Sequence, residues 1–275
     1  MNRLPITKRA QIIGLLVEGN SLRAASRLAD VSINTVTKLL IDTGRACAEY
    51  QDRTLRNLAC RRIQVDEIWA FTYAKQRNVP TAKAAPKWAG DTWTWTALDA
   101  ETKLIVSWLV GGRDSEYAMA FMDDLASRLA HRVQLTSDGH KAYLEAVEGA
   151  FGADIDYATL EKIYKTDPIA AQGRYSPPIC TGAKKRRVEG RPDPLHVSTS
   201  YVERQNLTMR MHMRRFTRLT NAFSKKVENH AHAVALHFMW YNFGRIHKTL
   251  RVTPAMEAGV SAHIWSLDEI ALLDG

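Results

Sequence analysis

The sequence predicts an α/β protein, in which a mixed-sheet core follows a small all-α domain. The hydrophobic periodicity changes at residue 63: before it, apolar residues recur every three to four positions, and after it they form short strand-like runs. The chain has 275 residues, of which 45% are hydrophobic. That length and composition are sufficient for one large packed domain and one small one.

Residues 6–43 predict three short helices, interrupted by a Gly-Asn pair and by a turn. Ser21 and Ser32 are placed to cap the second helix and the third, which we expect to end at Ile41. The spacing is typical of a helix-turn-helix, whose last helix presents polar side chains to the major groove. The exposed candidates for DNA contact are Asn34, Thr35, Thr37 and Lys38. A three-helix packing module without DNA contact is the alternative.

The remainder of the chain predicts a β-meander followed by helix crossovers. The expected elements are strands at 63–74, 93–98 and 104–110, a helix capped by Asp114 to about 132, a strand at 133–137, a helix at 141–149, a strand at 155–160 and a long helix from about 199. This is the element order of the ribonuclease H-like fold. The predicted domains are a helix-turn-helix domain at 1–50, a basic linker at 51–62, the ribonuclease H-like domain at 63–258 and a C-terminal tail at 259–275.

Residues 161–198 interrupt this pattern, because they are rich in proline and glycine. We expect a mobile loop before the last helix of the core. The basic run at 184–187 is interpreted as solvated surface, with a strand or a DNA clamp as the alternative.

Three carboxylates are the strongest candidates for chemistry. Asp66 and Asp138 end or interrupt strand-like runs, and Glu203 begins a basic, helix-forming stretch. Three such groups can hold a pair of divalent metals, an arrangement that suits phosphodiester chemistry. Each can also be an ordinary surface or capping carboxylate, and the Asp138-Gly139 pair is itself typical of a turn. Glu67 is expected to point to the strand face opposite Asp66.

The charge distribution favours a polyanionic partner. The formal net charge is +9, with +6 in residues 1–65, +9 in residues 184–226 and −6 elsewhere. Basic blocks that flank an acidic core favour nucleic acid, although solvated surface is the simpler interpretation of either block alone. No apolar run is long enough to cross a membrane, and three scattered cysteines give no zinc spacing, so we expect a cytoplasmic protein without zinc.

Four motifs together resemble the DDE transposases of the type-one insertion-sequence family, a resemblance that covers nearly the whole chain. They are VDEIW at 65–69, TSDGHKAY at 136–143, YVERQNLTMR at 201–210 with its continuation RRFTRLT and FSKK to 226, and YNFGRIHKTL at 241–250. The family often carries a cysteine-pair zinc module before the helix-turn-helix. This chain has no such pairs, so either the end-recognition element is lacking or the helix-turn-helix replaces it.

The resemblance implies a bacterial transposase that binds terminal inverted repeats and target DNA, both double-stranded, as a homodimer or higher oligomer. It implies that Asp66, Asp138 and Glu203 are catalytic and bind magnesium, with manganese as the substitute, for strand cleavage and transfer. Asn206 and Arg210 share a helix face with Glu203, and Arg210 matches a basic position that reaches DNA phosphate in related transposases. The predicted DNA contacts of this stretch are Asn206, Arg210, Arg214, Arg215 and Arg218. An inactive or domesticated DNA-binding regulator and a structure-selective nuclease are the alternatives.

Overall fold

The computed structural model describes residues 3–165, 179–217 and 222–275. The strands are β1 (Arg62–Thr72), β2 (Gly90–Asp99), β3 (Ile105–Gly111), β4 (Gln134–Ser137), β5 (Asp156–Lys165) and β6 (Ile179–Glu189). The longer helices are α1 (Ile6–Val17), α2 (Leu22–Leu28), α3 (Ile33–Thr54), α4 (Ser115–Arg128), α5 (Ala142–Phe151), α6 (Ser200–His212) and α7 (Val227–Met239). The short elements are η1 (Gln76–Thr81), η3 (Arg214–Phe216), η4 (Trp240–Gly244), α8 (Pro254–Glu257) and α9 (Leu267–Leu272).

The core of the molecule is a six-stranded mixed sheet in the order β3-β2-β1-β4-β5-β6. The first three strands form the predicted antiparallel meander, β4 runs parallel to β1, β5 runs parallel to β4, and β6 is antiparallel to β5. The order of the first five strands is consistent with a ribonuclease H-like core. Because β1 and β4 are parallel neighbours, the carboxyl end of β4 lies beside the first part of β1, where Thr136 pairs with Gln64.

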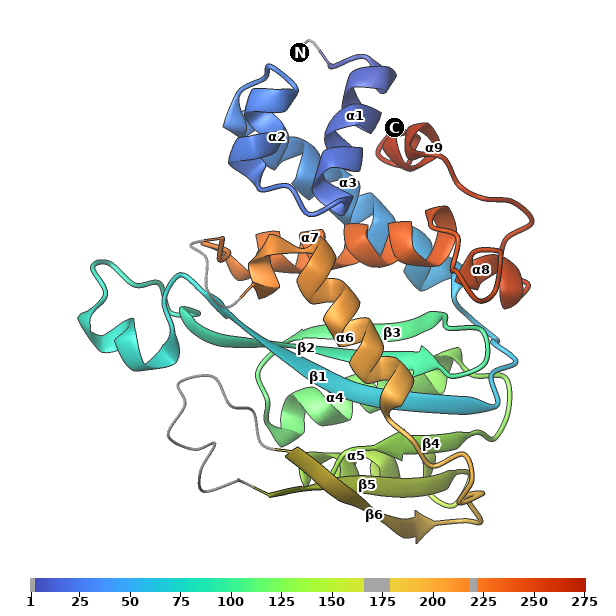
Figure 1. The fold of residues 1–275 in the computed structure, drawn as a ribbon. Coiled ribbons are helices and arrows are strands. Elements are labelled where there is room, and N and C mark those ends of the chain that lie inside the picture. Colours follow the sequence, from blue (N-terminus) through green and yellow to red (C-terminus); the bar gives the residue numbers. More distant parts are fainter. Residues whose placement is uncertain (1–2, 166–178, 218–221) are drawn as a thin grey trace.

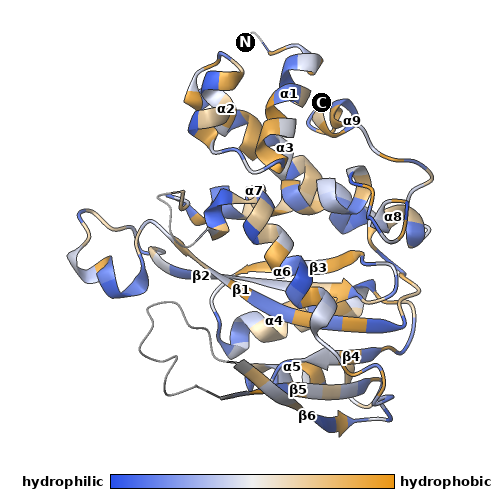
Figure 2. Ribbon diagram, viewed as in Figure 1, coloured by the Kyte–Doolittle hydropathy of each residue, from blue (hydrophilic) through white to orange (hydrophobic). Residues whose placement is uncertain are grey.

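Helices cover both faces of this sheet (Figure 1). The pair α4 and α5 packs on one face, whereas α6 and α7 lie on the other. The side chain of Asp114 caps α4, as predicted, by accepting a hydrogen bond from the Tyr117 backbone N–H. Trp95, Phe121 and Phe238 are among the fully buried side chains of the core. Figure 2 shows that β3 is largely hydrophobic, whereas the excursion that contains η1 is hydrophilic and projects away from the sheet.

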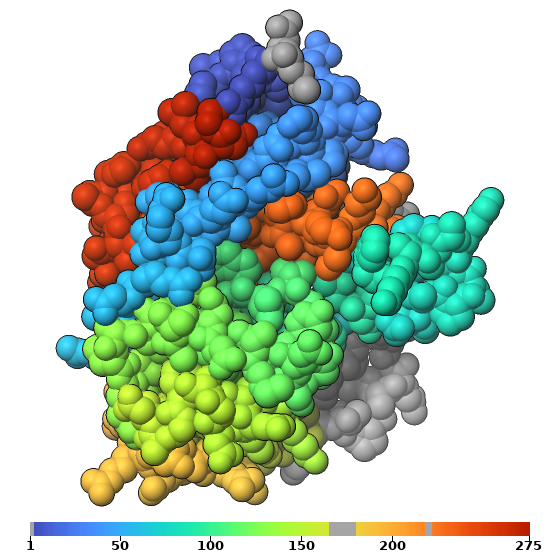
Figure 3. All heavy atoms as spheres, turned by 180° about the vertical axis from the view of Figure 1, so that it is seen from behind, coloured from blue at the N-terminus to red at the C-terminus, as the bar shows by residue number. Residues whose placement is uncertain are grey.

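The third helix is longer than the sequence predicts. Instead of ending at Ile41 before a separate basic helical linker, α3 runs without interruption from Ile33 to Thr54 and packs against α7. The back view shows it as a long diagonal ridge over the core (Figure 3). Gly44 lies at this contact, where a Cβ atom would be 2.5 Å from the carbonyl oxygen of His232 in α7. The glycine therefore permits the close packing of α3 against α7.

The predicted mobile loop at 161–198 is wrong for much of its length. β5 continues to Lys165 and pairs with β6, so the basic run 184–187 lies on an edge strand. Every residue from 180 to 189 is exposed, and a strand exposed on both faces shows no hydrophobic alternation in its sequence. The part of the predicted loop at 166–178 lies outside the described residues.

The predicted C-terminal tail contains helix α9, which packs against α1. Arg9 of α1 is buried, donates a hydrogen bond to the Ala271 carbonyl and pairs with Asp274. The first helix and the last therefore lie side by side (Figure 1). No helix in the described part of the chain is long and apolar enough to cross a bilayer.

Candidate active site

The three candidate carboxylates line one cleft of about 640 Å³. Asp66 lies in the middle of β1, Asp138 directly follows β4, and Glu203 lies in the first turn of α6. The register of β1 and β4 pairs Gln64 with Thr136, and each of these residues lies two positions before an aspartate. The parallel pairing therefore places the two aspartates side by side, and α6 adds the glutamate from the helical layer above.

The carboxylate oxygens of Asp66, Glu67 and Asp138 include a set that lies within 4.8 Å of one another. Glu67 is engaged elsewhere: one oxygen accepts from Arg113 Nε at 2.7 Å and the other accepts from the Tyr143 hydroxyl at 2.9 Å. Tyr143 belongs to α5, so Glu67 points to the sheet face opposite α6. Asp66 and Asp138 are consequently the pair that remains available to a cation in the cleft.

Asp66 lies in a surrounding that disfavours its charged form. Burial raises its pKa to about 7, and the neighbouring charges of Glu67, Asp138 and Glu203 act in the same direction, opposed by a backbone hydrogen bond from Glu67. A bound divalent cation would relieve this unfavourable negative charge. Clustered hard oxygen donors are also the ligand type that magnesium and manganese prefer, so the residues fit a metal site.

Asn206 occupies a different position from the predicted DNA contact. Its side chain is 5% exposed, and Nδ2 donates a hydrogen bond to Asp66 Oδ2 at 2.7 Å. The reason is that its face of α6 packs on β1 rather than facing solvent. Asn206 therefore orients the Asp66 carboxylate instead of presenting itself to DNA.

Glu203 is held by two neighbours. The Thr199 hydroxyl donates to Oε1 at 2.6 Å, and the ammonium group of Lys162 on β5 pairs with Oε2. Lys162 also lines the cleft. The Lys162 ammonium group thus pairs with the Glu203 carboxylate of α6, and no local pattern in the sequence indicates this contact.

Gln64 is a second residue that the sequence analysis missed. Its Oε1 accepts hydrogen bonds from the backbone N–H groups of Tyr201, at 2.9 Å, and Val202, at 3.2 Å. These are among the first-turn donors of α6 that have no partner within the helix. Because Gln64 precedes Asp66 by two positions on one strand face, it fixes the start of α6 above Asp66. A polar pair at i and i+2 within a buried strand is the signal that would have found it.

Asp138 takes part in a turn and also lines the cleft. Its Oδ1 accepts from the backbone N–H of His140 at 2.9 Å, which is a turn-stabilising bond, while the residue also lines the cleft. His140 Nδ1 in turn accepts from the Ala142 N–H at 3.1 Å at the start of α5. One histidine nitrogen is therefore committed to local structure.

Arg210, Arg214 and Arg215, the predicted basic residues after Glu203 that the structure describes, do not line this cleft. Arg210 is half-buried, Arg214 is exposed, and Arg215 donates to Ser224 Oγ at 2.5 Å. Arg214 and Arg215 line a separate pocket between the core and the N-terminal helices. Arg218 lies outside the described residues.

The DNA contacts predicted for the N-terminal helices lie in the first two turns of α3. Ser21 and Ser32 cap α2 and α3 as predicted, by accepting from the backbone N–H groups of Ala24 and Thr35. Asn34 and Lys38 are exposed, although Lys38 pairs with Asp42. The hydroxyls of Thr35 and Thr37 bond within their own helix, to Ser32 Oγ and the Ile33 carbonyl, and both residues are half-buried.

The chain matches no protein-family model and none of the curated proteins. Among solved structures, it is similar to a Mos1 transposase paired-end complex with left transposon end at 14% identity, covering 54% of this chain and 58% of that one, with a TM-score of 0.22. A Mos1 mariner paired-end complex with Mn matches at 17% identity over 54% and 59% of the two chains, also with a TM-score of 0.22. A pre-cleavage Mos1 transpososome matches at 11% identity over 87% and 78%, with a TM-score of 0.24. The chain spans less than two thirds of the first two proteins, and the superpositions are too poor to support an argument, so function is argued from the site.

Proposed function

We propose that this protein is a DNA transposase of a bacterial insertion sequence, and that it cleaves and joins DNA strands with a carboxylate triad and magnesium. The observation that carries the proposal is the convergence of Asp66, Asp138 and Glu203 on one cleft from two neighbouring strands and a helix. Asp66 and Asp138 are the ligands fixed in the sheet. Glu203 is the ligand whose position depends on α6.

The bound ions would supply charge neutralisation at the scissile phosphate and activation of a water or 3′-hydroxyl nucleophile. The chain's own groups prepare the site for them. Asn206 holds Asp66 Oδ2, Gln64 fixes the first turn of α6, and Thr199 orients Glu203. These contacts keep the carboxylates directed into the cleft, which limits the reorganisation needed when substrate binds.

DNA binding is assigned to the remaining predicted residues. In this proposal α2 and α3 form a helix-turn-helix that recognises the terminal inverted repeats, with Asn34 and Lys38 as its exposed contacts. Arg210, Arg214, Arg215 and Arg218 serve the phosphate backbone. Pairing of two element ends requires at least a homodimer on DNA, and target DNA is the second substrate.

The test is magnesium-dependent cleavage of a plasmid that carries the DNA flanking the coding sequence, with detection of strand transfer from the freed 3′-hydroxyl. Asp66→Asn, Asp138→Asn and Glu203→Gln are expected to abolish cleavage while DNA binding persists. Glu161→Gln is the matched control, because Glu161 is an exposed carboxylate that lines the same cleft without belonging to the triad.

Three results would contradict the proposal in different ways. DNA binding without cleavage by the wild type would indicate a regulator. Cleavage of hairpins or junctions without strand transfer or end preference would indicate a nuclease. Equal activity in wild type and triad variants would show that the cleft is not the active site.

A further inference from the structure

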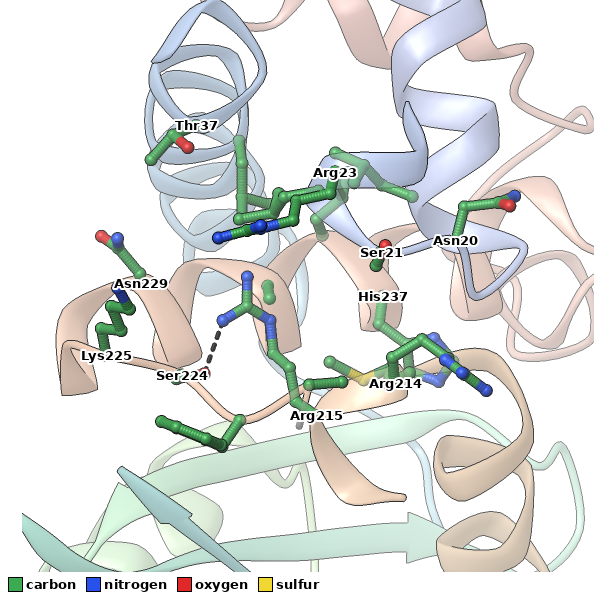
Figure 4. Close-up of a pocket in the computed structure, with 18 of the residues that line it drawn as sticks. Asn20, Ser21, Arg23, Thr37, Arg214, Arg215, Ser224, Lys225, Asn229 and His237 are labelled. Carbon is green, nitrogen blue, oxygen red and sulfur yellow. Dashed lines mark hydrogen bonds between the residues drawn. The ribbon is translucent and has the colours of Figure 1, made fainter. Parts of the chain in front are cut away.

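A second hollow, of about 800 Å³, lies between the N-terminal helices and the segment from η3 to α7 (Figure 4). Its floor is apolar and includes Leu16, Val17, Leu22, Leu40, Met213 and Leu236. Thr37 of α3 also lines it, so this pocket reaches the predicted recognition helix. We call it the interdomain pocket.

The charged residues that line the interdomain pocket in the described part of the chain are all cations. They are Arg23 of α2, Arg214 and Arg215 of η3, and Lys225 and Lys226 before α7. No Asp or Glu is among the described residues that line it. Figure 4 shows the Arg23 and Arg215 side chains extending into the same space from opposite sides. A concave surface with one sign of charge attracts a counter-ion of the other sign.

Arg215 lies half-buried at the wall of the pocket. Its Nη1 donates to Ser224 Oγ, and burial lowers its pKa to about 10. Among the described residues, no carboxylate forms an ion pair with it. A buried guanidinium is normally paired, because the loss of its hydration is otherwise uncompensated. The wall of the pocket therefore carries a half-buried cation that has no carboxylate partner among the described residues.

His237 is a buried polar side chain at the same pocket. It is 3% exposed and lines the pocket, and neither of its ring nitrogens has a hydrogen-bond partner among the described residues. Burial lowers its pKa to about 3, with the charges of His212 and Arg245 contributing, so the ring is neutral and offers one donor and one acceptor. Unmet buried polar atoms of this kind are uncommon in folded proteins and point to a missing ligand.

We propose that the interdomain pocket binds a backbone phosphate of the duplex DNA that the helix-turn-helix recognises. This inference rests on the proposed function and adds a contact site to it. A phosphate oxygen accepts charge-assisted hydrogen bonds from guanidinium groups in the fork geometry that arginine provides. The apolar floor suits the adjacent deoxyribose, and the position beside Thr37 places the phosphate next to the bases read by α3.

The test compares two double variants with equal loss of charge. Arg23→Gln/Arg214→Gln removes two exposed cations of the pocket, and Lys248→Gln/Arg251→Gln removes two exposed cations outside it. Arg215 is left unchanged in both variants, because its side chain donates a hydrogen bond to Ser224 and its replacement would disturb the local fold. Binding of a fluorescent duplex from the flanking DNA is followed by anisotropy over a range of salt concentrations. We expect the pocket variant to bind roughly tenfold more weakly and to reduce the salt slope by about 0.9 for each phosphate that the protein no longer neutralises.

The alternative outcomes are separable. If the wild type binds the duplex and the two double variants are weakened equally, the pocket assignment is overturned while DNA binding stands. If the wild type binds no DNA, both the pocket assignment and the proposed function fall. If calorimetry shows inorganic pyrophosphate binding that the pocket variant abolishes, while its DNA affinity equals that of the control variant, the pocket is a small-anion site and the inference is wrong.

Discussion

Two buried histidines make the stability of the fold dependent on pH. His230 is fully buried and His237 is 3% exposed, and the pKa of each is lowered to about 3. Burial is the main cause for both, followed by Arg215 for His230 and by His212 and Arg245 for His237. An unfolded chain binds protons at these positions near pH 6.5, whereas the folded protein does not. Stability is therefore complete above about pH 6.5 and is lost as the pH falls toward 3.

The size of the effect follows from the shift. At about pH 5, each histidine removes about 2 kcal/mol from the free energy of unfolding relative to neutral pH, and the pair removes about 4 kcal/mol. Asp66 acts in the opposite sense, because its raised pKa of about 7 lets the folded state take up a proton first. The comparison of wild type with a single histidine variant removes this contribution, since Asp66 is common to both.

The assay is urea unfolding of wild type and His237→Leu at about pH 7.5 and about pH 5. The variant should lose about 2 kcal/mol less than wild type on acidification. At neutral pH it should be at least as stable, because the leucine removes two buried nitrogens without partners. The reasoning is refuted if both proteins lose the same free energy between the two pH values.

Three further changes test the packing and the site. Gln64→Met removes the acceptor for two N–H groups at the start of α6, so the free energy of unfolding in urea should fall by about 2 kcal/mol. An unchanged midpoint would mean that water replaces the glutamine. Lys162→Met should change the free energy of unfolding by less than about 1 kcal/mol, because the ion pair with Glu203 is partly exposed. The change should tighten Mn²⁺ binding in calorimetry, because it frees the Glu203 carboxylate, and weaker binding would contradict this. Gly44→Ala should destabilise the protein by about 1–3 kcal/mol, because the added methyl group clashes between α3 and α7. Gly149→Ala, in open space on α5, should stabilise it by up to about 1 kcal/mol. Equal effects of the two changes in thermal unfolding would refute the packing argument.

The elements that the sequence predicts well have strong local signals. The meander of β1, β2 and β3 follows from alternating apolar residues, and Asp114 marks the start of α4 because a capping side chain acts within one turn. The three carboxylates stand out because each interrupts or begins a regular pattern. Their convergence on one cleft required the parallel pairing of β1 with β4 and the position of α6, which no short segment encodes.

The misinterpreted elements depend on distant partners. The length of α3 and the role of Gly44 depend on α7, nearly two hundred positions later in the chain. β6 has no buried face, so its basic residues show no strand period, and only pairing with β5 identifies it. Asn206 shares a helix face with Glu203 as expected, but the sequence does not say that this face lies against β1. Long-range packing thus decides the features that local patterns leave open.

The most direct test of the account is the binding of Mn²⁺ in the presence of duplex DNA, measured by electron paramagnetic resonance for wild type, Asp66→Asn, Asp138→Asn, Glu203→Gln and Glu161→Gln. The cleft geometry predicts that wild type and Glu161→Gln bind the ion with similar affinity, and that each triad variant binds it at least about tenfold more weakly. Undiminished Mn²⁺ binding in the triad variants would contradict the central claim that these three carboxylates form a metal-dependent active site.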